Sequence, residues 1–174
     1  LLQKMNASLE IESTKGEGSI FSFVLDLKTE NNENHHLSEN PENSLPSEIE
    51  ILQNKKILIV EDNPENMLFT ETVLLKKTHP LKILKAINAK KALILFEAEK
   101  PDLILMDINL GEIDGHTLTG MIRKKDKSVK IIAVTANAFK EEKERCLESG
   151  MNDFLSKPFS PENLVKMIVR NLQN

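Results

Sequence analysis

Three unbroken apolar runs of strand-forming residues limit most strongly what this chain can fold into. They are Ile57–Val60, Leu103–Met106 and Ile131–Val134. A strand that is apolar without interruption is buried on both faces, as in a parallel sheet covered by helices on each side. The segments between these runs repeat apolar residues at helical spacing. The sequence from Lys55 onward therefore predicts a doubly wound α/β domain with a five-stranded parallel sheet.

Two weaker strands and the connecting helices complete this pattern. Leu81–Ala86 and Asp153–Ser156 are expected nearer the sheet edges. Apolar stripes predict four helices, marked by Met67, Leu68, Leu74 and Leu75, by Ala92, Leu93 and Phe96, by Leu118, Met121 and Ile122, and by Leu164, Ile168 and Leu172. Residues 140–149 predict a polar, exposed helix that ends at Gly150, with Cys146 on it as a structural or surface thiol.

The first 54 residues differ from the rest. In residues 7–28 apolar side chains fall on every second position around Gly16-Glu17-Gly18, which predicts a β-hairpin. A lone hairpin is marginally stable in water, so we expect this one to be part of another domain. Residues 29–54 are polar and aperiodic and predict a flexible linker. Its pair His35-His36 lacks the further ligands that a metal site would need.

Composition argues against several classes of protein. The 174 residues include one cysteine, so no internal disulfide can form, which fits a reducing compartment. No apolar run is long enough for a membrane span or a signal peptide. A net charge of −4, with no Trp or Tyr, argues against nucleic-acid binding. The chain begins with Leu rather than Met, so we expect a fragment of a longer protein.

Polar residues follow the ends of four predicted strands. Glu61 and Asp62 follow the first, Asp107 ends the third, Thr135 follows the fourth and Lys157 the fifth. Because parallel strands bring their carboxyl ends to one edge of the sheet, we expect these side chains to meet. Three clustered carboxylates repel one another unless a cation joins them. Hard oxygen ligands with open positions suit Mg²⁺.

Each of these residues also has an ordinary structural interpretation. Asp62 or Asn63 could cap the helix that follows, Asp107 and Thr135 could close turns, and Lys157 could be a solvated surface lysine. Their joint occurrence at one edge favours chemistry instead. A carboxylate beside Mg²⁺ can attack phosphorus, which predicts phosphoryl transfer to Asp107. Lys157 and the Thr135 hydroxyl would neutralise and hydrogen-bond the phosphoryl oxygens.

Residues 55–174 resemble a response-regulator receiver domain over their whole length. The resemblance rests on five segments: Ile57-Leu58-Ile59-Val60-Glu61-Asp62-Asn63, Leu105-Met106-Asp107, Asp114-Gly115, Ala133-Val134-Thr135-Ala136 and Lys157-Pro158-Phe159. It implies a (βα)5 flavodoxin-like receiver fold with strand order 2-1-3-4-5. It also implies Asp107 as the phosphoacceptor and Mg²⁺, or Mn²⁺ in its place, as the cofactor.

The resemblance also implies a metal-ligand set. Asp62 and Asp107 would ligate the metal, Glu61 would act through water, and the backbone carbonyl of Asn109 would complete the protein ligands. One departure is visible: Gly111 stands where the family usually has Pro. This could loosen the loop after Asp107, but it removes no functional group.

A switch is implied by the same resemblance. Thr135 and Lys157 would contact the phosphoryl oxygens, and the Lys157–Pro158 bond would be cis. Thr135 would move toward the phosphate while Phe154 turns inward. This would remodel the face built from the fourth helix, the fifth strand and the fifth helix, a bistable element biased by a local charge. The same face could also join two copies in a homodimer.

The amino-terminal piece, Leu2–Leu27, resembles the last hairpin of a histidine-kinase ATP-binding domain, with Asn6-Ala7 in place of the usual glycine pair. This implies a bacterial hybrid histidine kinase, cytoplasmic in this portion and membrane-anchored upstream. Its nucleotide site and phosphodonor His would lie outside this chain, since His79 and His116 lack the required helical context. The implied domains are residues 1–28 for the hairpin remnant, 29–54 for the linker and 55–174 for the receiver.

The function implied is that of a phosphorelay receiver. Asp107 would accept a phosphoryl group from a kinase phosphohistidine, and the domain would switch conformation or pass the group to a histidine-phosphotransfer protein. The fragment itself would catalyse only its own phosphorylation and dephosphorylation, without nucleic-acid or membrane contact. A haloacid-dehalogenase-like phosphatase that uses Asp107 as its nucleophile is the alternative. That family has a second Asp two residues after the nucleophile, where this chain has Asn109. A phosphorylation-independent interaction module is disfavoured because every chemical residue is present.

Overall fold

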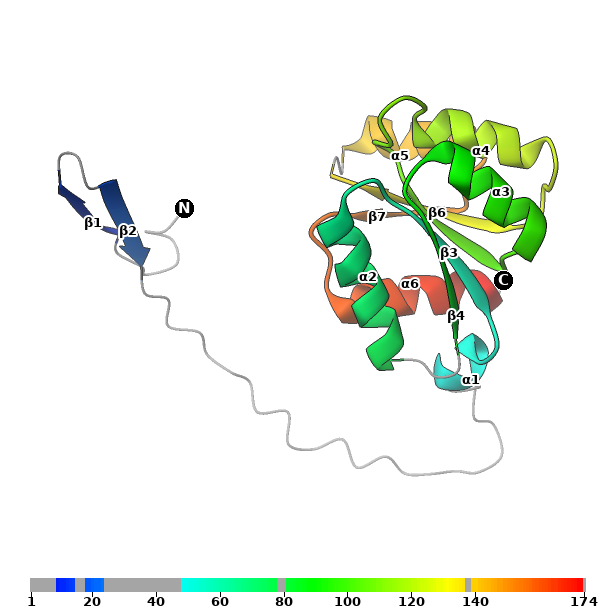
Figure 1. The fold of residues 1–174 in the computed structure, drawn as a ribbon, viewed down its shortest axis with the longest axis horizontal. Helices are drawn as coiled ribbons and strands as arrows, with labels where there is room; N and C mark the ends of the chain where they lie inside the picture. Colours follow the sequence, from blue (N-terminus) through cyan, green and yellow to red (C-terminus); the bar gives the residue numbers. More distant parts are fainter. Residues whose placement is uncertain (1–8, 15–17, 24–47, 78–80, 137–138, 174) are drawn as a thin grey trace. The chain divides into compact units, whose positions relative to one another are not determined.

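The structure, a computed structural model, describes residues 9–14, 18–23, 48–77, 81–136 and 139–173 (Figure 1). The chain divides into two compact units, Leu1–Pro41 and Glu42–Asn174. Among the described helices, none has the length and apolar character needed to span a bilayer.

The first unit contains the predicted β-hairpin. Strands β1 (Leu9–Thr14) and β2 (Gly18–Phe23) pair antiparallel, with Leu9 opposite Phe23 and Thr14 opposite Gly18. The alternating pattern around the glycine-rich turn therefore predicted the hairpin correctly. Residues 29–47 of the predicted linker lie outside the described residues.

The second unit is built on a five-stranded parallel sheet. Its strands are β3 (Lys56–Val60), β4 (Lys82–Ala86), β5 (Leu103–Asp107), β6 (Lys130–Thr135) and β7 (Asp153–Ser156). They lie in the order β4-β3-β5-β6-β7, and every neighbouring pair is parallel. Counted from β3, this is the order 2-1-3-4-5, so the predicted doubly wound fold is confirmed.

Helices cover both faces of this sheet. They are α2 (Pro64–Lys77), α3 (Ala89–Glu99), α4 (Gly115–Arg123), α5 (Lys140–Glu148) and α6 (Pro161–Gln173). One core cluster joins alternate strand residues, such as Ile104, to α3, α4 and α5, and the other joins residues such as Leu105 to α2 and α6 (Figure 1). Burial on both faces explains why the central strands are apolar throughout.

The folded unit extends ahead of Lys55, the start predicted for the receiver domain. A short helix, α1 (Glu48–Leu52), lies inside the segment predicted as linker, and it contacts α6. Leu52 is fully buried in the core cluster that also holds Leu164 and Ile168. Burial of Leu52 removes a large apolar side chain from water, so these residues belong to the folded domain.

On helices α2 and α5, some side chains differ in exposure from the prediction. On α2, Met67 and Leu74 are buried as expected, whereas Leu68 is 63% exposed and Leu75 is 38% exposed. On α5, the predicted polar helix ends before Gly150, whose φ of 95° is the left-handed conformation of a C′ glycine. Cys146, however, is fully buried, so the structural interpretation of this thiol is confirmed and the surface one is wrong. Burial raises the pKa of the Cys146 thiol to about 11.

Candidate functional site

The end of β3 carries the first two carboxylates. Glu61 is buried, and Asp62 beside it is exposed. The side chain of Asn63 caps α2, because its Oδ1 accepts the backbone N–H groups of Glu65 at 2.8 Å and Asn66 at 3.1 Å. Since Asn63 performs the capping, Asp62 remains available to a ligand.

The end of β5 carries Asp107, which is 5% exposed. Its Oδ1 accepts the backbone N–H of Asn109 at 2.9 Å. Asp114 begins α4, and its Oδ1 accepts the N–H of Thr117 at 2.7 Å, a bond that lowers the pKa of Asp114. Gly115 packs directly on the strand: a Cβ at this position would lie 2.4 Å from the carbonyl oxygen of Asp107. The Asp-Gly pair therefore sets how closely α4 approaches the phosphoacceptor predicted from the sequence.

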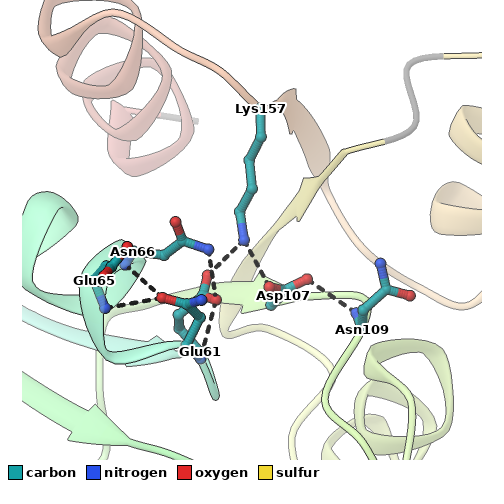
Figure 2. Close-up of polar contacts among 7 residues, drawn as sticks. Glu61, Glu65, Asn66, Asp107, Asn109 and Lys157 are labelled. Atoms are coloured by element: carbon teal, nitrogen blue, oxygen red, sulfur yellow. Dashed lines mark hydrogen bonds and ion pairs between the residues drawn. The ribbon is translucent and has the colours of Figure 1, made fainter. Parts of the chain in front are cut away.

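Lys157 connects the two buried carboxylates (Figure 2). Its Nζ donates to Oε2 of Glu61 and to Oδ2 of Asp107, each at 2.6 Å. The Lys157–Pro158 peptide bond is cis. The backbone N–H of Lys157 donates to the carbonyl of Thr135 at 2.7 Å. This bond connects the end of β7 to the end of β6. Lys157 therefore brings positive charge to the point where β3 and β5 end.

The protonation behaviour of the site follows from burial and charge. Burial, reinforced by the negative charge of Asp107, raises the pKa of Glu61 even though Lys157 and Asn66 donate to it. Burial alone would lower the pKa of Lys157, but its hydrogen bonds to Asp107 and Glu61 outweigh burial and raise it. Lys157 is thus held as a cation at neutral pH, beside more carboxylates than it can neutralise.

The carboxylates lie close enough together to share a cation. Glu61, Asp62 and Asp107 each offer an oxygen, and these oxygens all lie within 4.8 Å of one another. Hard oxygen donors in this number, with space for water, fit Mg²⁺. Asn109 is the second residue after Asp107, in the loop that leaves the same strand.

The two residues predicted to form a switch lie on neighbouring strands. Thr135 ends β6 and is 2% exposed, and Phe154 on β7 is half-buried against the core. The ammonium of Lys143, on α5, lies 5.0 Å from the centre of the Phe154 ring. This cation–π contact links α5 to the aromatic side chain.

Gly111 has a conformation that proline cannot adopt. Its φ is 75°, in the left-handed region, whereas proline is restricted to a φ near −65°. The glycine therefore gives the loop after Asp107 a different backbone path from that of a proline-containing loop, rather than only loosening the same path.

Asn66 is a site residue that the sequence analysis missed. Its Nδ2 donates to Oε1 of Glu61 at 3.1 Å, so it orients a predicted ligand (Figure 2). Asn66 is the third residue after Asn63, the cap of α2, and such a residue commonly reaches back toward the start of its helix. This spacing was the available signal. A groove of about 300 Å³ beside it is lined by Asn66, Phe69, Thr70, Lys157, Pro158 and Phe159.

The response regulator receiver domain family matches residues 57–169 of this chain. The chain belongs to this family. Receiver domains act in phosphorelay signal transduction, and several matching relatives are sensor histidine kinases. The alternative of a haloacid-dehalogenase-like phosphatase is not supported.

Similar proteins include two sensor histidine kinases. RcsC of Escherichia coli K12 is 38% identical over 124 residues, which make up 70% of this chain and 13% of RcsC. GacS of Pseudomonas protegens is 34% identical over 120 residues, or 66% of this chain and 13% of GacS. The receiver domain therefore matches a small part of each kinase.

Solved receiver domains share the fold. The receiver domain of sensor histidine kinase PA1611 from Pseudomonas aeruginosa PAO1 is 36% identical, with a TM-score of 0.64, and the match covers 70% of this chain and 99% of that one. That structure is described with a magnesium ion coordinated in its active-site cleft. A response regulator from Chloroflexus aurantiacus is 30% identical, with a TM-score of 0.65 over 70% of this chain and 99% of that one.

Proposed function

We propose that this receiver domain accepts a phosphoryl group on Asp107 from the phosphohistidine of a histidine kinase. The observation that carries the proposal is the double contact of Lys157, whose ammonium lies 2.6 Å from Oδ2 of Asp107 and 2.6 Å from Oε2 of Glu61. A buried carboxylate next to a fixed cation and two further carboxylates is suited to attack phosphorus with a metal present.

Asp62, Asp107 and the backbone carbonyl of Asn109 are the proposed ligands of Mg²⁺, or of Mn²⁺ in its place, with Glu61 acting through water. The spacing of the three carboxylates, within 4.8 Å, supports this set. The bound cation would supply charge neutralisation at the carboxylates and at the phosphoryl oxygens.

The chain's own residues account for the remaining steps. A carboxylate oxygen of Asp107 forms the new bond to phosphorus as the bond from phosphorus to the donor imidazole breaks, and the imidazole keeps that electron pair. Lys157 stabilises negative charge on the phosphoryl oxygens, and the Thr135 hydroxyl donates a hydrogen bond to them. Water can later attack the same phosphorus, which returns Asp107 to its free form.

The switch that follows would use Thr135 and Phe154. Phe154 is half-buried, and the ammonium of Lys143 lies over its ring. Movement of Thr135 toward the phosphoryl group would let this ring turn inward. The face built from α5, β7 and α6 would then present a different surface. This face is the proposed site for partner control and for a homodimer, and a histidine-phosphotransfer protein is the proposed next acceptor.

We also propose that the hairpin β1–β2 ends a kinase ATP-binding domain and that the parent protein is a hybrid histidine kinase with this portion in the cytoplasm. The similarity to receiver segments of RcsC and GacS supports this origin.

Intact-mass spectrometry tests the phosphoryl-transfer proposal. Incubation with Mg²⁺ and a small acyl phosphate should add one phosphoryl group to the wild-type chain and none to Asp107→Asn. Omission of Mg²⁺ should also abolish labelling. Equal labelling of the wild type and the variant would overturn the assignment of Asp107.

A further inference from the structure

A second cluster of side chains that can ligate a metal lies between α4 and α5, and it shares no residue with Glu61, Asp62 and Asp107 at the acidic edge. His116 comes from the first turn of α4, and Glu142 and Cys146 stand one turn apart on α5. One donor atom from each lies within 4.8 Å of the other two. The side chains of His116 and Glu142 are 14% and 12% exposed, and Cys146 is fully buried.

The hydrogen bonds of Ser149 determine which nitrogen of His116 carries a proton. The Ser149 hydroxyl donates to the carbonyl of Cys146 at 2.8 Å, so its single proton is already used. Ser149 Oγ also lies 3.2 Å from Nδ1 of His116. With its hydroxyl directed at that carbonyl, Ser149 accepts from Nδ1–H of His116, and the lone pair of a neutral imidazole lies on Nε2.

This lone pair faces another acceptor. Nε2 of His116 lies 2.8 Å from Oε1 of Glu142, and a carboxylate oxygen has no proton to donate. Three arrangements resolve the conflict: a second proton on the imidazole, rotation of the Ser149 hydroxyl toward Nδ1 while the Cys146 carbonyl keeps the N–H of Met151 at 3.0 Å, or a metal ion that both atoms ligate. The thiol of Cys146 lies within reach of the same point, which is the observation that favours a metal.

We propose that His116, Glu142 and Cys146 form a second metal site that takes a transition-metal ion such as Zn²⁺. Imidazole, carboxylate and thiolate are all zinc ligands, and the thiolate and imidazole disfavour Mg²⁺. Cys146 would lose its proton on binding, and a water molecule would complete four ligands. Tetrahedral zinc holds its ligand atoms roughly 3.5 Å apart. His116 Nε2 and Glu142 Oε1, now 2.8 Å apart, would therefore separate slightly as the metal enters between them and the Cys146 thiolate.

The surroundings of the cluster support this site. The bond from Nδ1–H of His116 to Ser149 is the outer hydrogen bond that metal-bound histidines commonly make. Arg145 contacts the other oxygen of Glu142, Oε2, at 3.5 Å, which leaves Oε1 directed at His116.

A metal here would join α4 to α5 (Figure 1). Helix α5 also carries Lys143, whose ammonium lies over the ring of Phe154. Metal binding would thus restrain the helix that contacts this aromatic side chain, independently of the chemistry at Asp107.

Cobalt substitution tests the site in the full chain. Co²⁺ bound by a thiolate absorbs in the near ultraviolet through sulfur-to-metal charge transfer, and Cys146 is the only cysteine in the sequence. We expect this band to appear with one Co²⁺ per chain in the presence of excess Mg²⁺, and to be displaced by Zn²⁺. His116→Ala and Glu142→Gln should weaken binding about tenfold or more, and Ser149→Ala, which keeps all three ligands, about 10- to 100-fold.

Two control variants separate this site from other sources of metal binding. Asp107→Asn, at the acidic edge, and the double variant His35→Ala/His36→Ala should keep the band with unchanged affinity. Circular dichroism of each variant checks that it remains folded. Absence of the band in the wild type would overturn the proposal. A band that His116→Ala and Glu142→Gln leave unchanged would overturn it as well.

Discussion

Lys157 is the residue on which the chemistry of the acidic edge depends most. Its ammonium contacts both buried carboxylates, and its side chain is only 21% exposed. Any cation that enters the site competes with this ammonium for the same oxygens, while an incoming phosphoryl group gains from its charge. Removal of the ammonium should therefore affect metal binding and phosphoryl transfer in opposite directions.

The variant Lys157→Met tests this opposition. We expect phosphorylation of Asp107 by an acyl phosphate to slow on the order of 10²-fold, because one charge-stabilising donor is lost. Mg²⁺ should bind more tightly, because Asp107 and Glu61 are freed. Isothermal titration calorimetry and the labelling rate give the two readouts. Lys166→Met, an exposed lysine on α6, is the control. A variant in which both quantities fall together would contradict this account of Lys157.

Asp153 is expected to make stability depend on pH. Burial alone would raise its pKa, but hydrogen bonds from Arg170, Asn171 and the Phe154 amide outweigh burial and hold the pKa below its usual value. A carboxylate with a lowered pKa in the folded state contributes stability above its unfolded pKa, and this contribution is lost as pH falls through the folded pKa.

Asp153→Asn should therefore lower the free energy of unfolding by about 1 kcal/mol at neutral pH. The difference from the wild type should shrink as the pH falls below the ordinary aspartate pKa of about 3.9. Urea unfolding across this range measures the effect, and Glu148→Gln, at an exposed carboxylate, serves as the control. A difference that stays constant with pH would show that Asp153 does not stabilise the fold through its charge.

At the scale of elements, close packing of α4 on β5 positions Asp107. Gly115→Ala would place a methyl group 2.4 Å from the carbonyl oxygen of Asp107, so the backbone must shift. We expect a loss of roughly 1–3 kcal/mol in unfolding free energy and slower phosphorylation. Gly120→Ala on the same helix is the matched control, because its Cβ would meet no atom within 4 Å. It should stabilise the helix by about 0.5–1 kcal/mol. Equal effects of the two variants would contradict the packing argument.

Helix α1 tests where the domain begins. Leu52 is fully buried, so Leu52→Ala should lower the free energy of unfolding by about 2–5 kcal/mol, as other buried leucines do. Leu68→Ala, at a leucine that is 63% exposed, should change it by less than about 1 kcal/mol. Chemical unfolding of both variants gives the comparison. A negligible effect of Leu52→Ala would support the boundary predicted at Lys55.

The elements differ in how well the sequence predicts them. The strands are predictable because unbroken apolar runs such as Leu103–Met106 have few alternatives to a buried strand. Helix α1 has only five residues, too few for a helical period to appear in the sequence, and its contact with α6 explains it. Helix α2 shows the same limit: periodicity predicts the helix but does not separate the buried Met67 from the exposed Leu68 beside it.

At the scale of the whole molecule, topology explains why the acidic edge was predictable. Parallel strands place Glu61, Asp107 and Lys157 at one edge once the strand order is known. Side-chain contacts were not predictable in the same way, because they depend on how neighbouring helices pack. The Lys143–Phe154 contact and the cluster of His116, Glu142 and Cys146 both depend on where α5 lies.

The central claim is that Asp107 forms the phosphoryl bond, and chemical mapping of that bond tests it most directly. Borohydride reduces an aspartyl phosphate to homoserine, a permanent mark that tandem mass spectrometry locates in a peptide. After treatment of the full chain with Mg²⁺ and an acyl phosphate, we predict homoserine at position 107 and unmodified residues at Glu61 and Asp62. Homoserine at position 62, or a fully phosphorylated chain with unmodified Asp107, would contradict the claim.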